Sequence, residues 1–268
     1  MPRYLAVVEY DGSGFQGSQI QARGRTVQGE IQRALQALTG ALLTVDMAGR
    51  TDRGVHARGQ VAAFHLERGL ETDRLASALN GIMARDVSVR EVWPAPDDFE
   101  PRRWAVRRRY RYTILNRKQR CALLERSAYH VPDELDVAAM SQAAAMLVGR
   151  HDFRAFGRAP QGDNTIRELV RLEVCRAGDS IVITAEADAF LRRMVRMLTG
   201  ALIDVGRGKK PAGDLWEALR TGVQEPVSAA APAKGLTLEA VAYDRQRLGR
   251  GLGLWWSCEP LAAAGAKP

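Results

Sequence analysis

The spacing of apolar residues in the first part of the chain predicts strands interrupted by two helices. Apolar positions recur at helical spacing over Val27–Thr39, which Gly40 ends, and again over Thr72–Ala84. Short runs that are almost entirely apolar predict strands at Tyr4–Tyr10, Leu42–Ala48, Gln60–His65 and Val87–Val92. The predicted order is therefore strand, helix, strand, strand, helix, strand.

The proline-rich segment Pro94–Pro101 is the clearest boundary signal in the chain. The same spacing rules predict further elements after it: a basic strand at Ala105–Leu115, a helix at Val137–Leu147, a loop at His151–Asn164, a hairpin of Arg167–Arg176 with Ser180–Ala187, helices at Phe190–Val205 and Asp214–Arg220, and a last strand at Leu236–Tyr243.

Both halves of the chain thus combine strands with helices that do not alternate as in a parallel α/β fold. We expect an α+β protein with two sheet-plus-helix domains, residues 1–104 and 105–250, and a tail at 251–268. The last residues of that tail, Leu261–Pro268, are small and are expected to be loose. A cleft between two such domains is the usual place for a ligand.

Composition excludes several classes of protein. The 268 residues are 46% hydrophobic and 26% charged, which is an ordinary globular mixture and too apolar for a disordered chain. No apolar run approaches the roughly 20 residues that a membrane-spanning helix needs. Glu9 and Asp11 interrupt the N-terminal apolar run, so we expect a strand there and no signal peptide.

The cysteines and histidines indicate neither a disulfide framework nor a metal site. Cys121, Cys175 and Cys258 are odd in number, far apart and without a Cys-x-x-Cys pair, which favours a cytoplasmic location. The four histidines form no metal-binding pattern. We therefore expect no metal.

The net charge of +8 is carried mainly by arginine, because only five of the 39 basic residues are lysines. Arginine binds phosphate groups through two hydrogen bonds and stacks on bases, which favours a nucleic-acid partner. A genome rich in arginine codons would give the same composition. Clustering at Arg102–Arg103, Arg107–Arg111 and Arg192–Arg196 favours the nucleic acid.

The segment Gly12–Gly17 matches the pattern GxGxxG directly after a strand, which is typical of dinucleotide or S-adenosylmethionine loops. However, no helix begins at Gly17, and no acidic residue ends a second strand at the required distance. We therefore favour a turn that presents backbone amides and Gln16 to RNA.

The densest polar segment is GRTDRGVHARGQVAAF, Gly49–Phe64, where one carboxylate, Asp52, lies among Arg50, Arg53 and Arg58. A lone aspartate in a turn most often only pairs with a neighbour. Here the glycines permit tight backbone turns, and the arginines favour the charged form of Asp52. A charged carboxylate beside phosphate-binding arginines is a plausible nucleophile.

Two further segments are suited to RNA. In the strand RRRYRYTILN, Arg107–Asn116, Tyr110 and Tyr112 share one face, and Arg109 and Arg111 share the other. Tyrosines stack on extruded bases and arginines bind phosphates, although a core strand with solvated arginines is the alternative. On the predicted helix Phe190–Val205, Arg192, Arg193 and Arg196 lie off the apolar stripe near the N-terminal end, where phosphate binds favourably.

Together these segments resemble the tRNA pseudouridine synthase A family. GRTDRGVHARGQVAAF is similar to the family's signature loop GRTDxGVHAxGQVxxF, and YDGSGFQGSQIQ is similar to its N-terminal motif. The later motifs follow in the family's order: RRRYRYTILN, HDFRAFGR, FLRRMVRMLTGALIDVGRGK and APAKGLTLEAVAYD. The resemblance extends over residues 3–244.

The resemblance implies a pseudouridine synthase fold, in which two ferredoxin-like α+β domains form a continuous mixed sheet with a catalytic cleft. It implies a homodimer that uses no metal, nucleotide or other cofactor and isomerises uridines in the anticodon arm of tRNA, at tRNA positions 38, 39 and 40. Asp52 would be the catalytic aspartate, Arg50 its partner and Tyr110 the residue that stacks on the base. Further contacts to the RNA are expected from Gln16, Arg58, Arg192, Arg193 and Arg196.

The sequence leaves the chemical role of Asp52 open, and it departs from the family pattern at two places. Asp52 could add to the base, attack C1′ of the ribose or abstract a ribose proton. Ser18 stands where the N-terminal motif usually has Trp, and Met83–Ala84 replaces a common Leu-Pro. An RNA-binding protein without catalysis is the alternative function, and it would leave Asp52 without a role.

Overall fold

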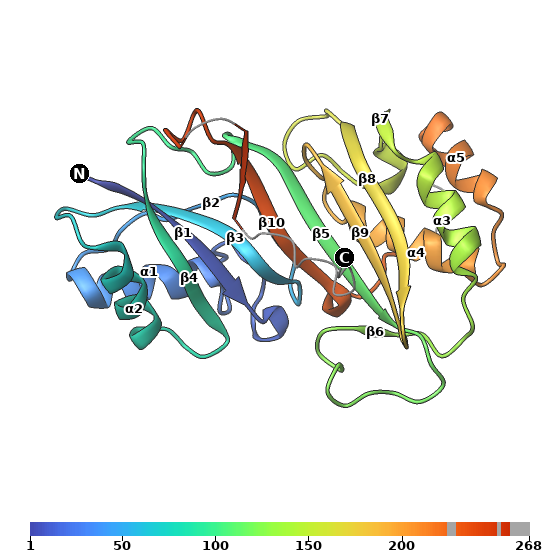
Figure 1. Ribbon diagram of the computed structural model, residues 1–268, viewed down its shortest axis with the longest axis horizontal. Helices are drawn as coiled ribbons and strands as arrows, with labels where there is room; N and C mark the ends of the chain where they lie inside the picture. The colour runs from blue at the N-terminus through green and yellow to red at the C-terminus, as the bar shows by residue number, and fades with distance from the viewer. Residues whose placement is uncertain (224–228, 251–252, 258–268) are drawn as a thin grey trace, which may run out of the picture. The chain divides into compact units, whose positions relative to one another are not determined.

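The computed structural model describes residues 1–223, 229–250 and 253–257. Its chain forms two compact units. The first contains Met1–Val106 and the described residues from Leu238 onward, and the second contains the described residues of Arg107–Thr237. Figure 1 shows the elements of both, coloured along the chain.

The first unit is a mainly antiparallel sheet with two helices. Its strands follow the order β4-β1-β3-β10, with β2 on β3 and β11 on β10. The bounds are β1 Arg3–Tyr10, α1 Val27–Thr39, β2 Asp46–Met47, β3 His56–His65, α2 Thr72–Ile82, β4 Val87–Ala95, β10 Leu236–Asp244 and β11 Leu254–Trp256. Helices α1 and α2 contact each other, and α2 packs on β4. Strand β1 is buried at every position but one, which explains its almost continuous apolar sequence.

The second unit has strands in the order β5-β9-β8-β7, with β6 parallel to β5. The bounds are β5 Ala105–Leu115, β6 Tyr129–His130, α3 Val137–Met146, β7 Gly149–Asp152, β8 Ile166–Ala177, β9 Ser180–Ala187, α4 Met194–Gly206 and α5 Ala212–Thr221. Helix α3 contacts strand β8 and the helices α4 and α5. Because parallel and antiparallel pairs both occur, the sheet is mixed, and the predicted α+β class is confirmed.

Elements with strong local signals agree with the sequence predictions. Helix α1 has the predicted bounds because the Thr26 hydroxyl accepts a hydrogen bond from the Gly29 amide at its start, and Gly40 adopts a left-handed conformation at its end. Strands β5 and β9 also have the predicted bounds.

Other predictions were wrong in their extent. The strand expected at Leu42–Ala48 is reduced to Asp46–Met47, and its exposed Leu42 shows that the apolar run is not a core strand. The expected loop at His151–Asn164 begins inside β7 and contains a short 3₁₀ helix at Arg154–Phe156.

The chain returns to the first unit through β10. The sequence placed residues 105–250 in one domain, whereas β10 pairs with β3 and residues from Leu238 belong with the first unit. This pairing joins residues far apart in the sequence, so no local sequence pattern predicts it. Of the predicted tail at 251–268, only residues 253–257 are described, and Leu254–Trp256 form β11 on β10. Leu261–Pro268 lie outside the described residues.

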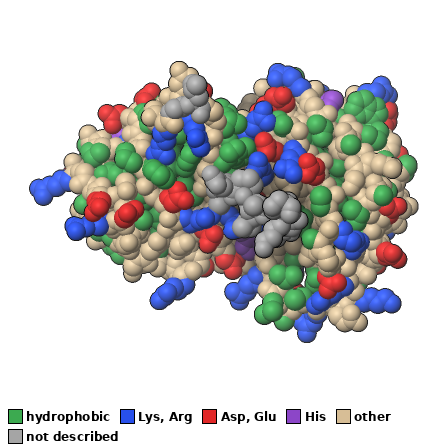
Figure 2. Space-filling model, in the orientation of Figure 1, with side chains coloured by type: hydrophobic (Ala, Val, Ile, Leu, Met, Phe, Trp, Pro, Cys, Tyr) green, Lys and Arg blue, Asp and Glu red, His purple; other side chains and the backbone are tan. Residues whose placement is uncertain are grey.

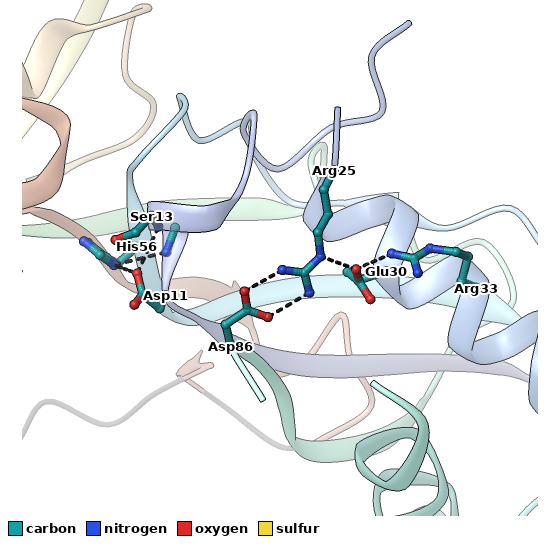
Figure 3. A network of polar contacts seen from close by, with 8 residues as sticks. Asp11, Ser13, Arg25, Glu30, Arg33, His56 and Asp86 are labelled. Atoms are coloured by element: carbon teal, nitrogen blue, oxygen red, sulfur yellow. Dashed lines mark hydrogen bonds and ion pairs between the residues drawn. The ribbon is translucent and has the colours of Figure 1, made fainter. Parts of the chain in front are cut away.

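Arg25 holds the segment between β1 and α1 in place (Figure 3). Its guanidinium donates to both carboxylate oxygens of Asp86, at 2.5 and 2.8 Å, and also to Glu30. The same guanidinium lies 4.3 Å from the centroid of the Phe15 ring. The hydrogen bonds from Arg25 are the main reason that the pKa of Asp86 lies below its ordinary value.

Replacing Arg25 with methionine should therefore destabilise the protein by about 1–2 kcal/mol near neutral pH, because Glu30 and Asp86 lose a charged donor. A carboxyl group with a lowered pKa stabilises the fold above its unfolded-state pKa, and this contribution disappears as the pH falls through the lowered value. The difference between wild type and Arg25→Met should accordingly shrink below about pH 4. Urea unfolding between neutral and acidic pH measures it.

Arg74→Met is the matched control, because the ion pair of Arg74 with Glu71 lies on the surface. It should leave the free energy of unfolding nearly unchanged at every pH. Equal effects of the two substitutions, or a pH-independent effect of Arg25→Met, would contradict this account of Arg25.

Candidate active site

The predicted catalytic residue, Asp52, lies on the loop between β2 and β3 in the first unit. Arg50 and Asp52 are exposed, whereas Thr51 between them is 6% exposed and points inward. Arg50 and Asp52 therefore lie on the outer, solvent-facing side of the loop.

The inner side of this loop rests on the N-terminal motif. The Thr51 amide donates to the Ser18 hydroxyl at 2.9 Å, and the Ser18 amide donates to the Thr51 carbonyl at 3.1 Å. The hydroxyl oxygens of Thr51 and Tyr10 lie 2.8 Å apart. Burial raises the pKa of Tyr10 to about 12, so its phenol stays protonated over the physiological range.

Two glycines of the GxGxxG segment allow this close approach. A Cβ atom on Gly12 would lie 2.0 Å from the Val55 carbonyl oxygen, and one on Gly17 would lie 2.9 Å from the Thr51 carbonyl oxygen. Gly17 also has φ of +111°, a conformation that disfavours other residues. The glycines thus serve contact with the Asp52 loop, which accounts for the pattern without a dinucleotide.

The expectation that this turn offers its backbone amides to RNA is wrong for most of them. The amides of Gly12, Ser13, Gln16 and Ser18 already donate to protein atoms. The Gly12 amide donates to Nδ1 of His56 at 3.1 Å. The Ser13 amide donates to Asp11 (Figure 3). Gln16 itself is half-buried.

Arg58 is half-buried at the start of β3, six residues after Asp52, and its carbonyl oxygen accepts a hydrogen bond from Arg90 at 3.4 Å. Arg50, Asp52, Arg58 and Gln16 therefore belong to the same unit. The supporting residues Tyr10, Ser18 and Gln60 were not predicted. Tyr10 carried a signal, because a phenol at the end of an apolar strand indicates a buried hydrogen bond, whereas Ser18 and Gln60 lie in polar motifs where nothing marks them as buried.

Tyr110 lies on β5 in the second unit and is half-buried. Its ring meets Phe190 edge to face, with centroids 5.2 Å apart. Tyr112, on the same face, is fully buried, and its hydroxyl donates to the Pro232 carbonyl at 2.8 Å. The shared face therefore combines one core tyrosine with one that is partly accessible.

The arginines of β5 are not simply solvated. Arg109 donates to Glu186 on the neighbouring strand at 2.8 and 3.0 Å, and its side chain is only 13% exposed. Arg107 also pairs with Glu186, at 3.5 Å. Part of the basic charge in RRRYRYTILN thus neutralises a buried carboxylate rather than facing a ligand.

The predicted helix Phe190–Val205 begins late, because α4 starts at Met194. Arg192 pairs through its backbone with Arg158, and Arg193 has φ of 64°, so neither residue is helical. Both side chains are exposed. Arg196 is on the helix, and its Nε donates to the Ala231 carbonyl at 2.7 Å, an internal contact that sequence analysis did not anticipate.

On the face drawn in Figure 2, basic side chains are scattered among acidic ones. Among the described residues, no group of three or more His, Cys, Asp or Glu side chains is arranged to hold a metal ion. None of the described helices combines the length and the apolar character required to cross a membrane.

The fold and this loop define an α+β protein that exposes one carboxylate beside an arginine on a firmly held turn. A family model described as tRNA pseudouridine synthase matches residues 6–102 and 143–244. The chain belongs to the tRNA pseudouridine synthase family, whose reaction is the isomerisation of uridine to pseudouridine in tRNA.

The chain is similar to curated proteins over nearly the whole length of both sequences. The chain is 42% identical to tRNA pseudouridine synthase A of Myxococcus xanthus, over 91% of this chain and 92% of the relative. It is 44% identical to the protein of that name from Roseiflexus sp. (strain RS-1), over 90% and 91%. It is also 44% identical to the one from Rhizobium meliloti (strain 1021), over 91% and 100%.

Proposed function

We propose that this protein converts uridines in the anticodon arm of tRNA to pseudouridine and that Asp52 is the catalytic carboxylate. The observation that carries the proposal is the exposed Asp52 on a loop whose backbone is held from the inside, in a chain of the tRNA pseudouridine synthase family. The reaction breaks the N1–C1′ bond of uridine, turns the uracil and joins C5 to C1′. No atom is gained or lost.

Arg50 is the partner of Asp52 in this proposal. Both side chains leave the loop on its outer side, with the inward Thr51 between them. A guanidinium so placed orients the carboxylate for the reaction.

Tyr110 packs on the target base. A uridine inside a stem has to leave the base stack before Asp52 can reach it, and this extrusion costs a few kcal/mol. Stacking on an aromatic ring offsets part of that cost. The edge-to-face contact with Phe190 is suited to holding the Tyr110 ring in one orientation while leaving ring surface for the base.

Gln16, Arg58, Arg192, Arg193 and Arg196 contact the RNA in this proposal. Arg192 and Arg193 are the strongest candidates because both are exposed, and guanidinium groups bind phosphate through two hydrogen bonds. Arg196 contributes charge beside them and also anchors the Ala231 carbonyl. Such contacts position the tRNA without reading its sequence.

The proposal includes a homodimer in the cytoplasm. The family resemblance implies the dimer, and a tRNA substrate implies the compartment where tRNA is used. Light scattering on the purified protein measures the dimer, with the mass of two chains as the expected result and the mass of one chain as the contrary one.

The proposed function is tested by incubating the purified protein with unmodified tRNA transcripts and mapping pseudouridine. We expect pseudouridine at anticodon-arm uridines, and none when those uridines are replaced by cytidine. Binding of tRNA without any isomerisation would overturn the proposal in favour of a non-catalytic RNA-binding protein.

A further inference from the structure

The backbone on both sides of Asp52 is hydrogen-bonded to buried groups. The Gly49 carbonyl accepts from Gln60 at 3.1 Å and from the Ser18 hydroxyl at 3.4 Å. The Thr51 amide and carbonyl are both bound to Ser18, and the Asp52 carbonyl accepts from the Val55 amide at 3.1 Å. Consecutive peptide groups from Gly49 to Asp52 are thus fixed while the side chains of Arg50 and Asp52 remain outside.

Ser18 occupies the centre of these contacts. Its side chain is fully buried, its hydroxyl both accepts from Thr51 and donates to Gly49, and its own amide binds the Thr51 carbonyl. The neighbouring Gly17 also approaches the Thr51 carbonyl closely, since a Cβ atom on it would lie 2.9 Å from that oxygen. Ser18 therefore links the N-terminal motif to the Asp52 loop through three hydrogen bonds.

Tyr10 and Gln60 add a second set of buried contacts to the Asp52 loop. Gln60 is fully buried, and its amide nitrogen lies 3.5 Å from the Tyr10 hydroxyl as well as 3.1 Å from the Gly49 carbonyl. The Tyr10 hydroxyl in turn meets the Thr51 hydroxyl. All of these groups lie within the first unit.

We propose that Ser18, Thr51, Tyr10 and Gln60 are positioning residues for the isomerisation, because they fix the peptide groups that carry Arg50 and Asp52. The inference rests on the proposed function of Asp52. All four side chains are buried, so we expect none of them to contact the substrate. They fix the direction in which the Asp52 side chain leaves the loop. Reaction rates are sensitive to displacements of a catalytic group by about 1 Å.

The test compares Ser18→Ala and Thr51→Val with the wild type in single-turnover reactions at saturating enzyme. Each variant removes one buried hydroxyl group from the hydrogen bonds that hold the Asp52 loop. The rate constant should fall about 10- to 100-fold, while the Kd for tRNA stays within about twofold, because neither residue contacts RNA. Thr51→Ser keeps the hydroxyl that meets Tyr10, and it should restore most of the rate.

Ser257→Ala is the matched control in the same unit. Its hydroxyl is also buried, accepts from the Val241 amide at 2.9 Å and donates to the Gly59 carbonyl at 2.7 Å. Its removal should lower the melting temperature about as much as Ser18→Ala but leave the single-turnover rate unchanged. At saturating enzyme a merely smaller folded fraction does not alter that rate constant, so the comparison separates positioning from stability.

Unchanged rates in Ser18→Ala and Thr51→Val would overturn the inference, as would equal losses in Ser257→Ala or a failure of Thr51→Ser to recover. Asp52→Asn is measured beside them. An inactive Asp52→Asn with active Ser18→Ala contradicts the positioning role alone. An active Asp52→Asn contradicts the proposed function itself.

Discussion

Replacing Asp52 with asparagine should reduce the rate of pseudouridine formation at least about a thousandfold, because an amide supplies neither the nucleophile nor the base that each possible route requires. The side chain keeps its size, and hydrogen bonds between Thr51 and Ser18 hold the loop. Binding of tRNA should therefore stay close to that of the wild type. Pseudouridine mapping and a filter-binding titration measure the two effects.

Asp97→Asn is the control for the loss of one negative charge, since Asp97 is also exposed and lies in a turn of the first unit. It should retain the wild-type rate. Measurable turnover by Asp52→Asn within tenfold of the wild type would remove Asp52 from the chemistry. Weak tRNA binding by that variant would instead indicate a role in binding.

Affinity for tRNA should fall about a hundredfold between about 50 mM and about 200 mM salt, if about four phosphates are neutralised. Each guanidinium that binds a phosphate releases condensed counterions, and the released ions make binding weaker as salt rises. The exposed Arg192 and Arg193 are the residues we expect to contribute most. Titrations of labelled tRNA at several salt concentrations give the slope.

The double substitution of Arg192 and Arg193 by methionine should reduce that slope by about 2, one unit for each lost phosphate contact. Arg74→Met removes another exposed cation, on α2, and should leave the slope unchanged. A nearly flat salt dependence of the wild type would show that the arginine clusters do not form the RNA surface.

Local signals explain which elements the sequence predicted well. The bounds of α1 follow from a capping threonine and a terminal glycine that act within a few residues. The strand Ala105–Leu115 follows from its alternating pattern, although the pattern could not show that Arg109 binds a buried glutamate on the next strand. That contact depends on the pairing of β5 with β9.

Local signals also explain the errors. The apolar spacing of Leu191 suggested a helix from Phe190, but the backbone pairing of Arg192 with Arg158 occupies that segment and delays α4 to Met194. Likewise, the GxGxxG pattern is the same whether its glycines approach a phosphate group or another loop of the protein. Their contacts with Val55 and Thr51 decided between the two.

The sequence by itself determined the α+β class, the family and the candidate residues Arg50, Asp52 and Tyr110, because these depend on local periodicity and on a distinctive motif. Only the tertiary structure decided that Thr51 turns inward onto Ser18 and Tyr10 and that β10 returns to pair with β3. The physical reason is that hydrogen bonds and strand pairs between distant segments depend on how the chain folds back. Residue spacing does not encode that geometry.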